Sequence, residues 1–343
     1  MKENIRNFSL DEVERVISSM SEPRYRAAQV FRWLYQKGAE SFSEMSDVPE
    51  KLRFRLNQKY TIDSLQSDHM FVSEDGTKKF IFKLRDNRYI ESVMITDENR
   101  NTVCISTQVG CKYNCVFCAS GKMGFIRNLD VSEIIGQILY IKLKENVKIS
   151  NVVFMGMGEP FDNYDALIKA ISIINAREGL NIGARKITVS TSGIVPGIKK
   201  FADAGWQVRL SVSLHAPDDA TRSSLMPVNK KYPVAVLLDA CNYYISRTGR
   251  RITFEYILIA GVNDKENHLS GLERIAKKLH ADINVIPYSR IKNCGFTSPS
   301  AEKIRWFVGS LRKKGIKATV RNSRGSDINA ACGQLAGARS FCE

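Results

Sequence analysis

The spacing of hydrophobic and polar positions changes along the chain, and the changes divide it into regions. In the first 60 residues, apolar positions recur every three or four residues, as in SLDEVERVISSM and YRAAQVFRWLYQKG, which predicts amphipathic helices. The stretch MSDVPEKLRFRLNQKY predicts a third short helix, with Asp47 as its cap and Pro49 in its first turn. Between residues 70 and 100 the period becomes two, as in KKFIFKL and RYIESVMIT, which predicts β-hairpins.

From residue 102 onward, apolar strand-like runs alternate with helical stretches such as VSEIIGQILYIKLK and EKIRWFVGSLRKKG. Repeated strand–helix units predict parallel strands, so the fold class is α/β. Six such units predict a partial (β/α)6 barrel, and an open doubly wound sheet is the alternative. The six strands are expected at residues 102–107, 151–160, 186–193, 208–217, 252–262 and 283–289.

These patterns divide the chain into a small helical N-terminal domain (1–70), a β-hairpin extension (71–100), the partial barrel (101–325) and a C-terminal tail (326–343). Polar or glycine-rich residues follow almost every expected barrel strand, as in Gly158-Glu159-Pro160 and Ser213-Leu214-His215. Since the sites of barrel enzymes lie at the carboxyl ends of the strands, these segments are expected to converge on one site.

One of these segments, GCKYNCVFCASGKMGF, holds three cysteines, Cys111, Cys115 and Cys118, in the spacing C-x3-C-x2-C. A structural zinc site needs four ligands and usually two C-x2-C pairs, whereas only one pair is present; His69 or Cys104 would have to complete such a site. Iron–sulfur clusters are commonly held by four thiolates. Three cysteines on a four-iron cluster would leave one iron open to bind a substrate.

Composition indicates in which compartment the protein acts. The 343 residues are 43% hydrophobic, and the charged amino end MKENIRNFSLDEVERV lacks the apolar core of a signal peptide. No run approaches the roughly 18 apolar residues of a membrane span. We therefore expect a soluble cytoplasmic protein that acts without a membrane. In a reducing compartment, eight cysteines indicate metal binding or catalysis more than disulfides, and Cys241, Cys294 and Cys342 fit no pattern.

The formal net charge of +15 favours a polyanionic partner such as nucleic acid. Two regions are especially basic. Residues 301–343 hold nine Lys and Arg against three Asp and Glu, and residues 222–251 hold six against one. Either region could instead be a solvated face, but together with the cysteine chemistry they favour RNA.

The cysteine spacing, with Phe117 before the last cysteine, resembles the radical S-adenosylmethionine (SAM) enzymes. Nearly the whole chain is similar to the RlmN and Cfr methyltransferases of ribosomal RNA adenine. The segments that carry this resemblance are EPRYRAAQVFRWLYQKG, GCKYNCVFCASGKMGFIRNL, VVFMGMGEP, STSGIVP, SVSLHAP and DINAACGQLAG. The resemblance implies one [4Fe-4S] cluster with Cys111, Cys115 and Cys118 as ligands and its fourth iron bound to SAM. It also implies two SAM molecules per turnover and radical chemistry that an electron donor of the flavodoxin or ferredoxin type starts.

The resemblance assigns roles to three further residues. Cys332 matches the cysteine that the first SAM methylates, and the radical from the second SAM takes a hydrogen from that S-methyl group so that its carbon can add to adenine. Cys104 matches the thiol that then releases the product by forming a disulfide with Cys332. Glu91 matches the proposed acceptor of the proton from the base. From the residues alone, Cys104 could equally be a buried apolar side chain, and Glu91 an outward-facing carboxylate.

Other positions match the family's SAM contacts, and they are Gly158, Glu159, Ser190, Ser213, Leu214, His215 and Ser289. The last departs from the family, which usually has asparagine there. RlmN modifies carbon 2 of adenine and Cfr carbon 8, and Pro160 of the GEP motif is RlmN-like, which favours carbon 2 in 23S rRNA. RlmN-type enzymes often also modify tRNA. We expect a monomer, and the alternative from another class is a non-enzymatic iron–sulfur protein that binds RNA.

Overall fold

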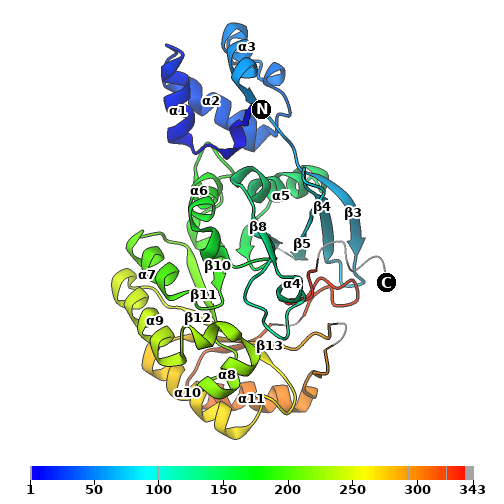
Figure 1. The fold of residues 1–343 in the computed structure, drawn as a ribbon, viewed down its shortest axis with the longest axis vertical. Coiled ribbons are helices and arrows are strands. Elements are labelled where there is room, and N and C mark those ends of the chain that lie inside the picture. Colours follow the sequence, from blue (N-terminus) through cyan, green and yellow to red (C-terminus); the bar gives the residue numbers. More distant parts are fainter. Residues whose placement is uncertain (1, 99, 292–293, 322, 337–343) are drawn as a thin grey trace.

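The computed structural model describes residues 2–98, 100–291, 294–321 and 323–336. Cys342 and the end of the expected tail lie outside these residues. The molecule is elongated, with a small group of helices at one end and a curved sheet lined by helices at the other (Figure 1).

The N-terminal helices form a small group at one end of the molecule (Figure 1). They are α1 (Leu10–Ser19), α2 (Tyr25–Arg32) and α3 (Glu50–Lys59). Ser9 and Glu12 form a capping box at the start of α1. Two short strands, β1 (Glu3–Asn4) and β2 (Tyr60–Thr61), pair in parallel and close the domain.

The expected cap of the third helix is wrong. The helix α3 begins after Pro49, which makes no side-chain capping bond. Asp47 instead accepts a hydrogen bond from the indole N–H of Trp33. The carboxylate is therefore used to join α3 to the preceding helical segment.

The main sheet has ten strands in the order β14-β13-β12-β11-β10-β9-β6-β5-β4-β3. All six expected barrel strands are present and pair in parallel with their neighbours, which confirms the α/β class. Within the described residues the end strands do not pair, so the barrel is partial. The parallel strands are β6 (Arg100–Cys104), β9 (Asn151–Phe154), β10 (Ile187–Thr191), β11 (Arg209–Ser213), β12 (Thr253–Leu258), β13 (Asp282–Pro287) and β14 (Ala318–Val320). The last, only three residues long, was not expected.

Three antiparallel strands extend the sheet beyond β6. They are β3 (Gln66–Val72), β4 (Lys78–Lys83) and β5 (Tyr89–Asp97). The extension therefore begins at Gln66 rather than at residue 71. The strand β3 could not be recognised from the sequence, because QSDHMFV is a polar, mostly exposed edge strand in which apolar and polar residues do not alternate regularly.

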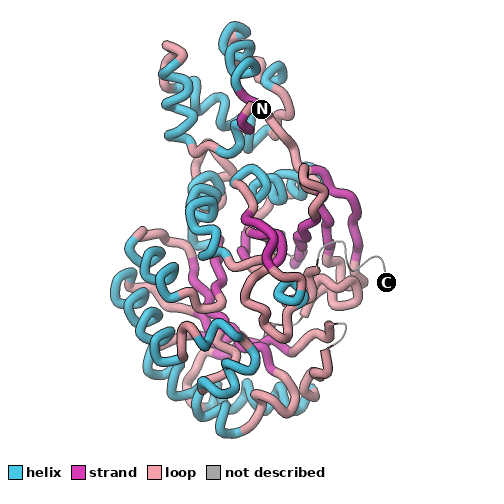
Figure 2. The backbone as a smooth tube through the Cα atoms, viewed as in Figure 1, coloured by secondary structure: helices cyan, strands magenta, loops and turns pink. Residues whose placement is uncertain are grey.

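Helices cover the outer side of the curved sheet (Figure 2). Asp130 and Glu133 form a capping box at the start of the first of them. Between β11 and β12 the chain forms two helices, and the second of these was not expected. The helices are α5 (Val131–Lys144), α6 (Tyr164–Asn175), α7 (Val195–Asp203), α8 (Asp219–Leu225), α9 (Val234–Thr248), α10 (Glu266–Leu279) and α11 (Ala301–Lys313).

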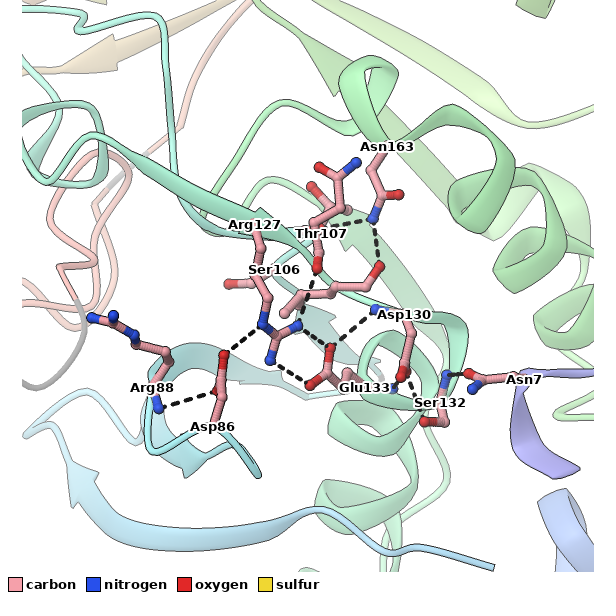
Figure 3. A network of polar contacts seen from close by, with 12 residues as sticks. Asn7, Asp86, Arg88, Ser106, Thr107, Arg127, Asp130, Ser132, Glu133 and Asn163 are labelled. Carbon is pink, nitrogen blue, oxygen red and sulfur yellow. Dashed lines mark hydrogen bonds and ion pairs between the residues drawn. The ribbon is translucent and has the colours of Figure 1, made fainter. Parts of the chain in front are cut away.

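A polar network joins the three parts of the molecule (Figure 3). Arg127, on the short strand β8 (Phe125–Asn128), donates to Asp86 of the extension at 2.7 Å and to both carboxylate oxygens of Glu133 on α5. The backbone N–H of Ser132 donates to Asn7 of the helical domain at 2.8 Å. These bonds fix the start of α5 against both neighbouring parts.

Candidate active site

A cavity of about 600 Å³ is lined by the barrel strands and by the loops that follow their carboxyl ends. Ten of the residues proposed from the sequence line it, so segments far apart in the chain do converge there. They are Cys104, Cys111, Cys115, Cys118, Gly158, Glu159, Ser190, Ser213, His215 and Cys332.

The cysteine loop follows β7 (Gln108–Gly110), which pairs with β8. Gly110 has φ +72°, and a Cβ there would lie 1.8 Å from the carbonyl oxygen of Gly124, so the turn requires glycine. The N–H of Cys111 donates to that same carbonyl at 3.1 Å, and the N–H of Cys118 donates to the carbonyl of Cys115 at 3.0 Å. The loop thus holds its three thiols through its own backbone.

The three thiols fit an iron–sulfur cluster. Burial raises the pKa of Cys111 to about 12, and burial followed by the charges of Cys118 and Cys111 raises the pKa of Cys115. Thiols crowded together in this way ionise readily only when a metal centre replaces their protons. No three donors among the described residues are placed to hold a single metal ion. In a [4Fe-4S] cluster each cysteine binds its own iron, so the donors need not converge on one point.

Glu159 of the GEP motif ties two loops together. Its side chain accepts hydrogen bonds from the N–H groups of Phe161 at 3.0 Å and of Ser192, after β10, at 2.7 Å. The residue is 3% exposed, and burial raises the pKa of its carboxyl group to about 7. Gly158, before it, has φ +99°, and a Cβ would lie 2.5 Å from the Cβ of Gln108.

His215 lies on the wall of the cavity as a neutral ring. Its Nδ1 accepts from the N–H of Ile257 at 3.0 Å, so Nε2 carries the proton. Burial and then the charge of Arg222 lower its pKa to about 3. The ring of Phe117 packs edge-on against it at 4.9 Å between centroids. The aromatic residue of the cysteine motif therefore packs against a residue of the expected SAM site.

The tail that carries Cys332 crosses the cavity and is held on two sides. On one side, the N–H of Ala119 donates to the carbonyl of Gly333 at 2.7 Å. On the other, the N–H of Gly325 donates to Asp75 at 3.0 Å, in the turn between β3 and β4. Figure 1 shows this segment between α4 (Ala119–Lys122) and the antiparallel strands.

Cys104 ends β6, is buried and lines the same cavity as Cys332. Burial and then the nearby Cys332 raise its pKa to about 12. Both cysteines are free thiols in this structure. Cys294, for which no role was expected, places its sulfur 3.5 Å from the carbonyl oxygen of Val116 in the cysteine loop.

Three proposed site residues are not in the lining of the cavity. Glu91 is fully buried on β5, with Lys79 Nζ 4.0 Å from its carboxylate. Leu214 is buried, and its backbone bonds to neighbouring segments. Ser289 donates to the hydroxyl of Ser323 at 2.7 Å, and Ser323 is the residue that reaches the cavity.

Sequence reasoning missed several charged residues around the cavity, among them Glu255, Arg321 and Arg222. Glu255 and Arg321 line it, and Arg321 donates to the sulfur of Met155 at 3.0 Å. A single carboxylate within the apolar strand ITFEYILI was a signal that could have identified Glu255. Arg222 was counted in a basic surface region, yet it is fully buried and cannot belong to that surface.

In the part of the chain that the structure describes, every helix is too short or too polar to cross a membrane.

Comparison with known proteins identifies the family. Residues 105–270 match the radical SAM superfamily, and residues 3–62 match the ribosomal RNA large subunit methyltransferase N-terminal domain. A probable dual-specificity RNA methyltransferase RlmN from Thermoanaerobacter sp. (strain X514) is 46% identical over 97% of both chains. Another, from Geobacillus kaustophilus, is 44% identical over 97% of this chain and 92% of its own.

A solved structure agrees with these sequence matches. The crystal structure of a radical SAM methyltransferase from Sphaerobacter thermophilus has a TM-score of 0.91 and 43% identity, and the match covers 97% of this chain and 99% of that one. Membership of this superfamily implies a [4Fe-4S] cluster and SAM, which the three cysteines fit. The chain belongs to the RlmN family of radical SAM RNA methyltransferases.

Proposed function

We propose that the protein methylates carbon 2 of an adenosine in 23S rRNA, and of one in tRNA, through an S-methyl group on Cys332. The observation that carries this proposal is the placement of Cys104, Cys332 and the three cysteines of the loop around one cavity. A protein that only bound RNA through an iron–sulfur cluster would need the loop cysteines but not the other two. Pro160 of the GEP motif is RlmN-like and supports carbon 2 over carbon 8.

Cys111, Cys115 and Cys118 would hold the cluster. When bound, the cluster and SAM supply a 5′-deoxyadenosyl radical, one of the radical chemistries that cofactors bring to proteins. Glu159, Ser190, Ser213 and the Nε2–H of His215 line the wall beside the cysteine loop and offer polar groups to SAM. Leu214 supports this wall from behind with its backbone, and Ser289 acts through Ser323.

Cys332 would carry the methyl group and give up one hydrogen atom to the deoxyadenosyl radical, so that its thioether carbon could bond to the adenine. The one electron left over after the ring carbon loses its proton would return to the bound cofactors. Glu91 takes the proton from the ring carbon. It lies on the face of β5 that also carries Val93 and Ile95, which line the cavity, so its carboxylate is directed toward the cavity side of the sheet. Lys79 beside it also donates to the carbonyl of Asn329 at 3.4 Å, in the tail. Glu91 is thereby linked to the segment that presents Cys332.

Cys104 then attacks the sulfur of Cys332, releases the methylated base and leaves a disulfide. Because Cys104 is buried and its pKa is raised, the thiolate forms only when an internal group takes its proton. The nearby guanidinium of Arg321 opposes that rise.

The change Cys104→Ala tests the proposal. The variant keeps the loop cysteines, Cys332 and Glu91, so it can form the carbon–carbon bond but cannot release the product. We expect protein expressed in cells to carry RNA joined through a methylene on Cys332. Nuclease digestion followed by peptide mass spectrometry would find the adduct on the AACGQLAG peptide. Chromatography of nucleosides from RNA treated with the wild-type protein, against 2-methyladenosine and 8-methyladenosine standards, would show which ring carbon is modified.

The matched control is Cys241→Ala, which removes a buried thiol that is not among the cavity-lining residues. It should turn over normally and carry no adduct. Multiple turnover by Cys104→Ala without an adduct would refute the assignment of Cys104. A bond to carbon 8 would refute the choice of carbon 2.

A further inference from the structure

Arg222 is a fully buried cation in the first turns of α8. A buried charge is costly unless it is fully hydrogen-bonded, so the partners of this guanidinium show what it is held there to do. All five of its N–H groups are used. Nε donates to the carbonyl of Leu214 at 3.1 Å, and Nη2 donates to the carbonyls of Ser192 at 2.7 Å and Ser213 at 3.1 Å.

The remaining donors fix the guanidinium itself. Nη1 donates to the side-chain oxygen of Asn229 at 2.8 Å and to the carbonyl of Tyr232 at 3.5 Å. The amide of Asn229 in turn donates to Asp219 and Ser223 of the same helix. The guanidinium of Arg222 is therefore held in one orientation, unlike that of a flexible surface arginine.

Three of the five bonds end on the segments that follow β10 and β11. Ser192 follows Ser190, Ser213 ends β11, and both segments form the wall of the cavity. The guanidinium of Arg222 thus sets the spacing between the loops after β10 and β11. Among the residues that the structure describes, no backbone hydrogen bonds of the sheet join the loops beyond the paired residues of these two strands. Gly193 passes so close that a Cβ there would lie 3.1 Å from Nη2.

The same helix also reaches the cysteine loop. The N–H of Val116, next to Cys115, donates to the carbonyl of Leu225 at the end of α8 at 3.0 Å. Arg222 therefore places a fixed cation on the helix that is bonded to the cysteine loop. Such a cation favours the more negative, reduced state of a cluster held by that loop, since net local charge tunes such potentials.

We propose that Arg222 is a positioning residue of the active site, which shapes the two SAM-binding loops with its donors and eases reduction of the cluster with its charge. This inference rests on the proposed function, because it assumes that the cavity holds the cluster and SAM. The two effects are separable, since lysine keeps the charge but lacks the five-donor fork, and glutamine keeps a donor but lacks the charge.

The test compares Arg222→Lys and Arg222→Gln in protein with a reconstituted cluster. We expect both variants to bind SAM about 10- to 100-fold more weakly, as loss of a supporting hydrogen-bond partner typically does. Only Arg222→Gln should shift the midpoint potential of the cluster, to a more negative value. Equilibrium titration with SAM and a redox titration followed by electron paramagnetic resonance give the two readouts.

Arg6 provides a matched control, because it is also a buried arginine that donates to the carbonyls of Asp63 and Ala39, but in the helical domain. Arg6→Gln should lower stability and leave both readouts at wild-type values. If the Arg222 variants do not fold, Asn229→Ala keeps Arg222 but removes one of its two Nη1 acceptors, together with the bonds of Asn229 to Asp219 and Ser223, and it should still weaken SAM binding.

Wild-type SAM affinity and potential in the Arg222 variants, or wild-type SAM affinity in foldable Asn229→Ala, would overturn the inference while leaving the proposed function intact. Failure of the wild-type protein itself to bind iron and SAM would refute the proposed function, and the inference with it.

Discussion

Because the carboxyl group of Glu159 is buried, we expect the stability of the protein without its cofactors to depend on pH in a specific way. Burial raises the pKa of this carboxyl group to about 7 from an ordinary value of 4.5. Between these two pH values the folded chain holds a proton that the unfolded chain has lost. Stability from this group is therefore fully present below pH 4.5 and is lost as the pH rises to about 7. A shift of about 2.5 pKa units corresponds to roughly 3 kcal/mol in the free energy of unfolding.

Glu159→Gln isolates this effect, because the amide does not titrate. The variant loses an acceptor for one of two backbone N–H groups, which costs about 1–3 kcal/mol at every pH. As the pH rises from 4.5 to 7, however, the free energy of unfolding of the variant should rise by roughly 3 kcal/mol relative to that of the wild type. Urea unfolding of both proteins across this range measures the difference, in which the titration of all other groups cancels.

Glu74→Gln, in the exposed turn between β3 and β4, is the matched control and should run parallel to the wild type. Parallel curves for Glu159→Gln and the wild type would refute the reasoning, because they would mean that Glu159 ionises as easily when folded as when unfolded.

Three further predictions follow from the same site and surface. Cys115→Ala should abolish both iron uptake and SAM cleavage, and retained cleavage would contradict the assignment of the cluster ligands. Gly158→Ala should lower the free energy of unfolding by about 1–3 kcal/mol, because φ +99° and the Cβ of Gln108 leave no room for a methyl group; an unchanged urea midpoint would count against this. Binding of RNA should weaken steeply with salt, because a chain of net charge +15 releases counterions from the phosphate backbone; a flat response would mean that the basic regions are only solvated faces.

The sequence was most informative where short motifs and strong periodicity coincide. Six parallel strands could be predicted because each is an apolar run followed by a helix with its own period. The convergence of Cys111, Gly158 and Ser213 on one cavity followed from the rule that barrel strands carry their sites at one edge. The edge strand β3 could not be predicted, since its polar, exposed residues show no alternation.

Buried charges were the other limit of sequence reasoning. Arg222 lies in DDATRSSLM, a stretch that reads as an exposed polar helix. Only the folded chain shows that the ends of β10 and β11 and the segment after α8 close over it. Ser289 shows the opposite case, in which a position that matches a family contact reaches the cavity only through Ser323. In both cases the outcome depends on tertiary neighbours that no local pattern encodes.

The tail that presents Cys332 has a consequence for the order in which the protein folds. In the tail, the N–H of Gly325 donates to Asp75, and the carbonyl of Asn329 accepts from Lys79. The two residues of each pair are 250 positions apart in the sequence. The cysteine loop, by contrast, also has bonds within itself, from Cys118 to Cys115 and from Cys111 to Gly124. Contacts of long sequence separation carry the larger loop-closure entropy and form late. We therefore expect the chain to complete its cysteine loop early and to bring Cys104 and Cys332 together last, so refolding under reducing conditions should restore iron uptake before it restores methyl transfer.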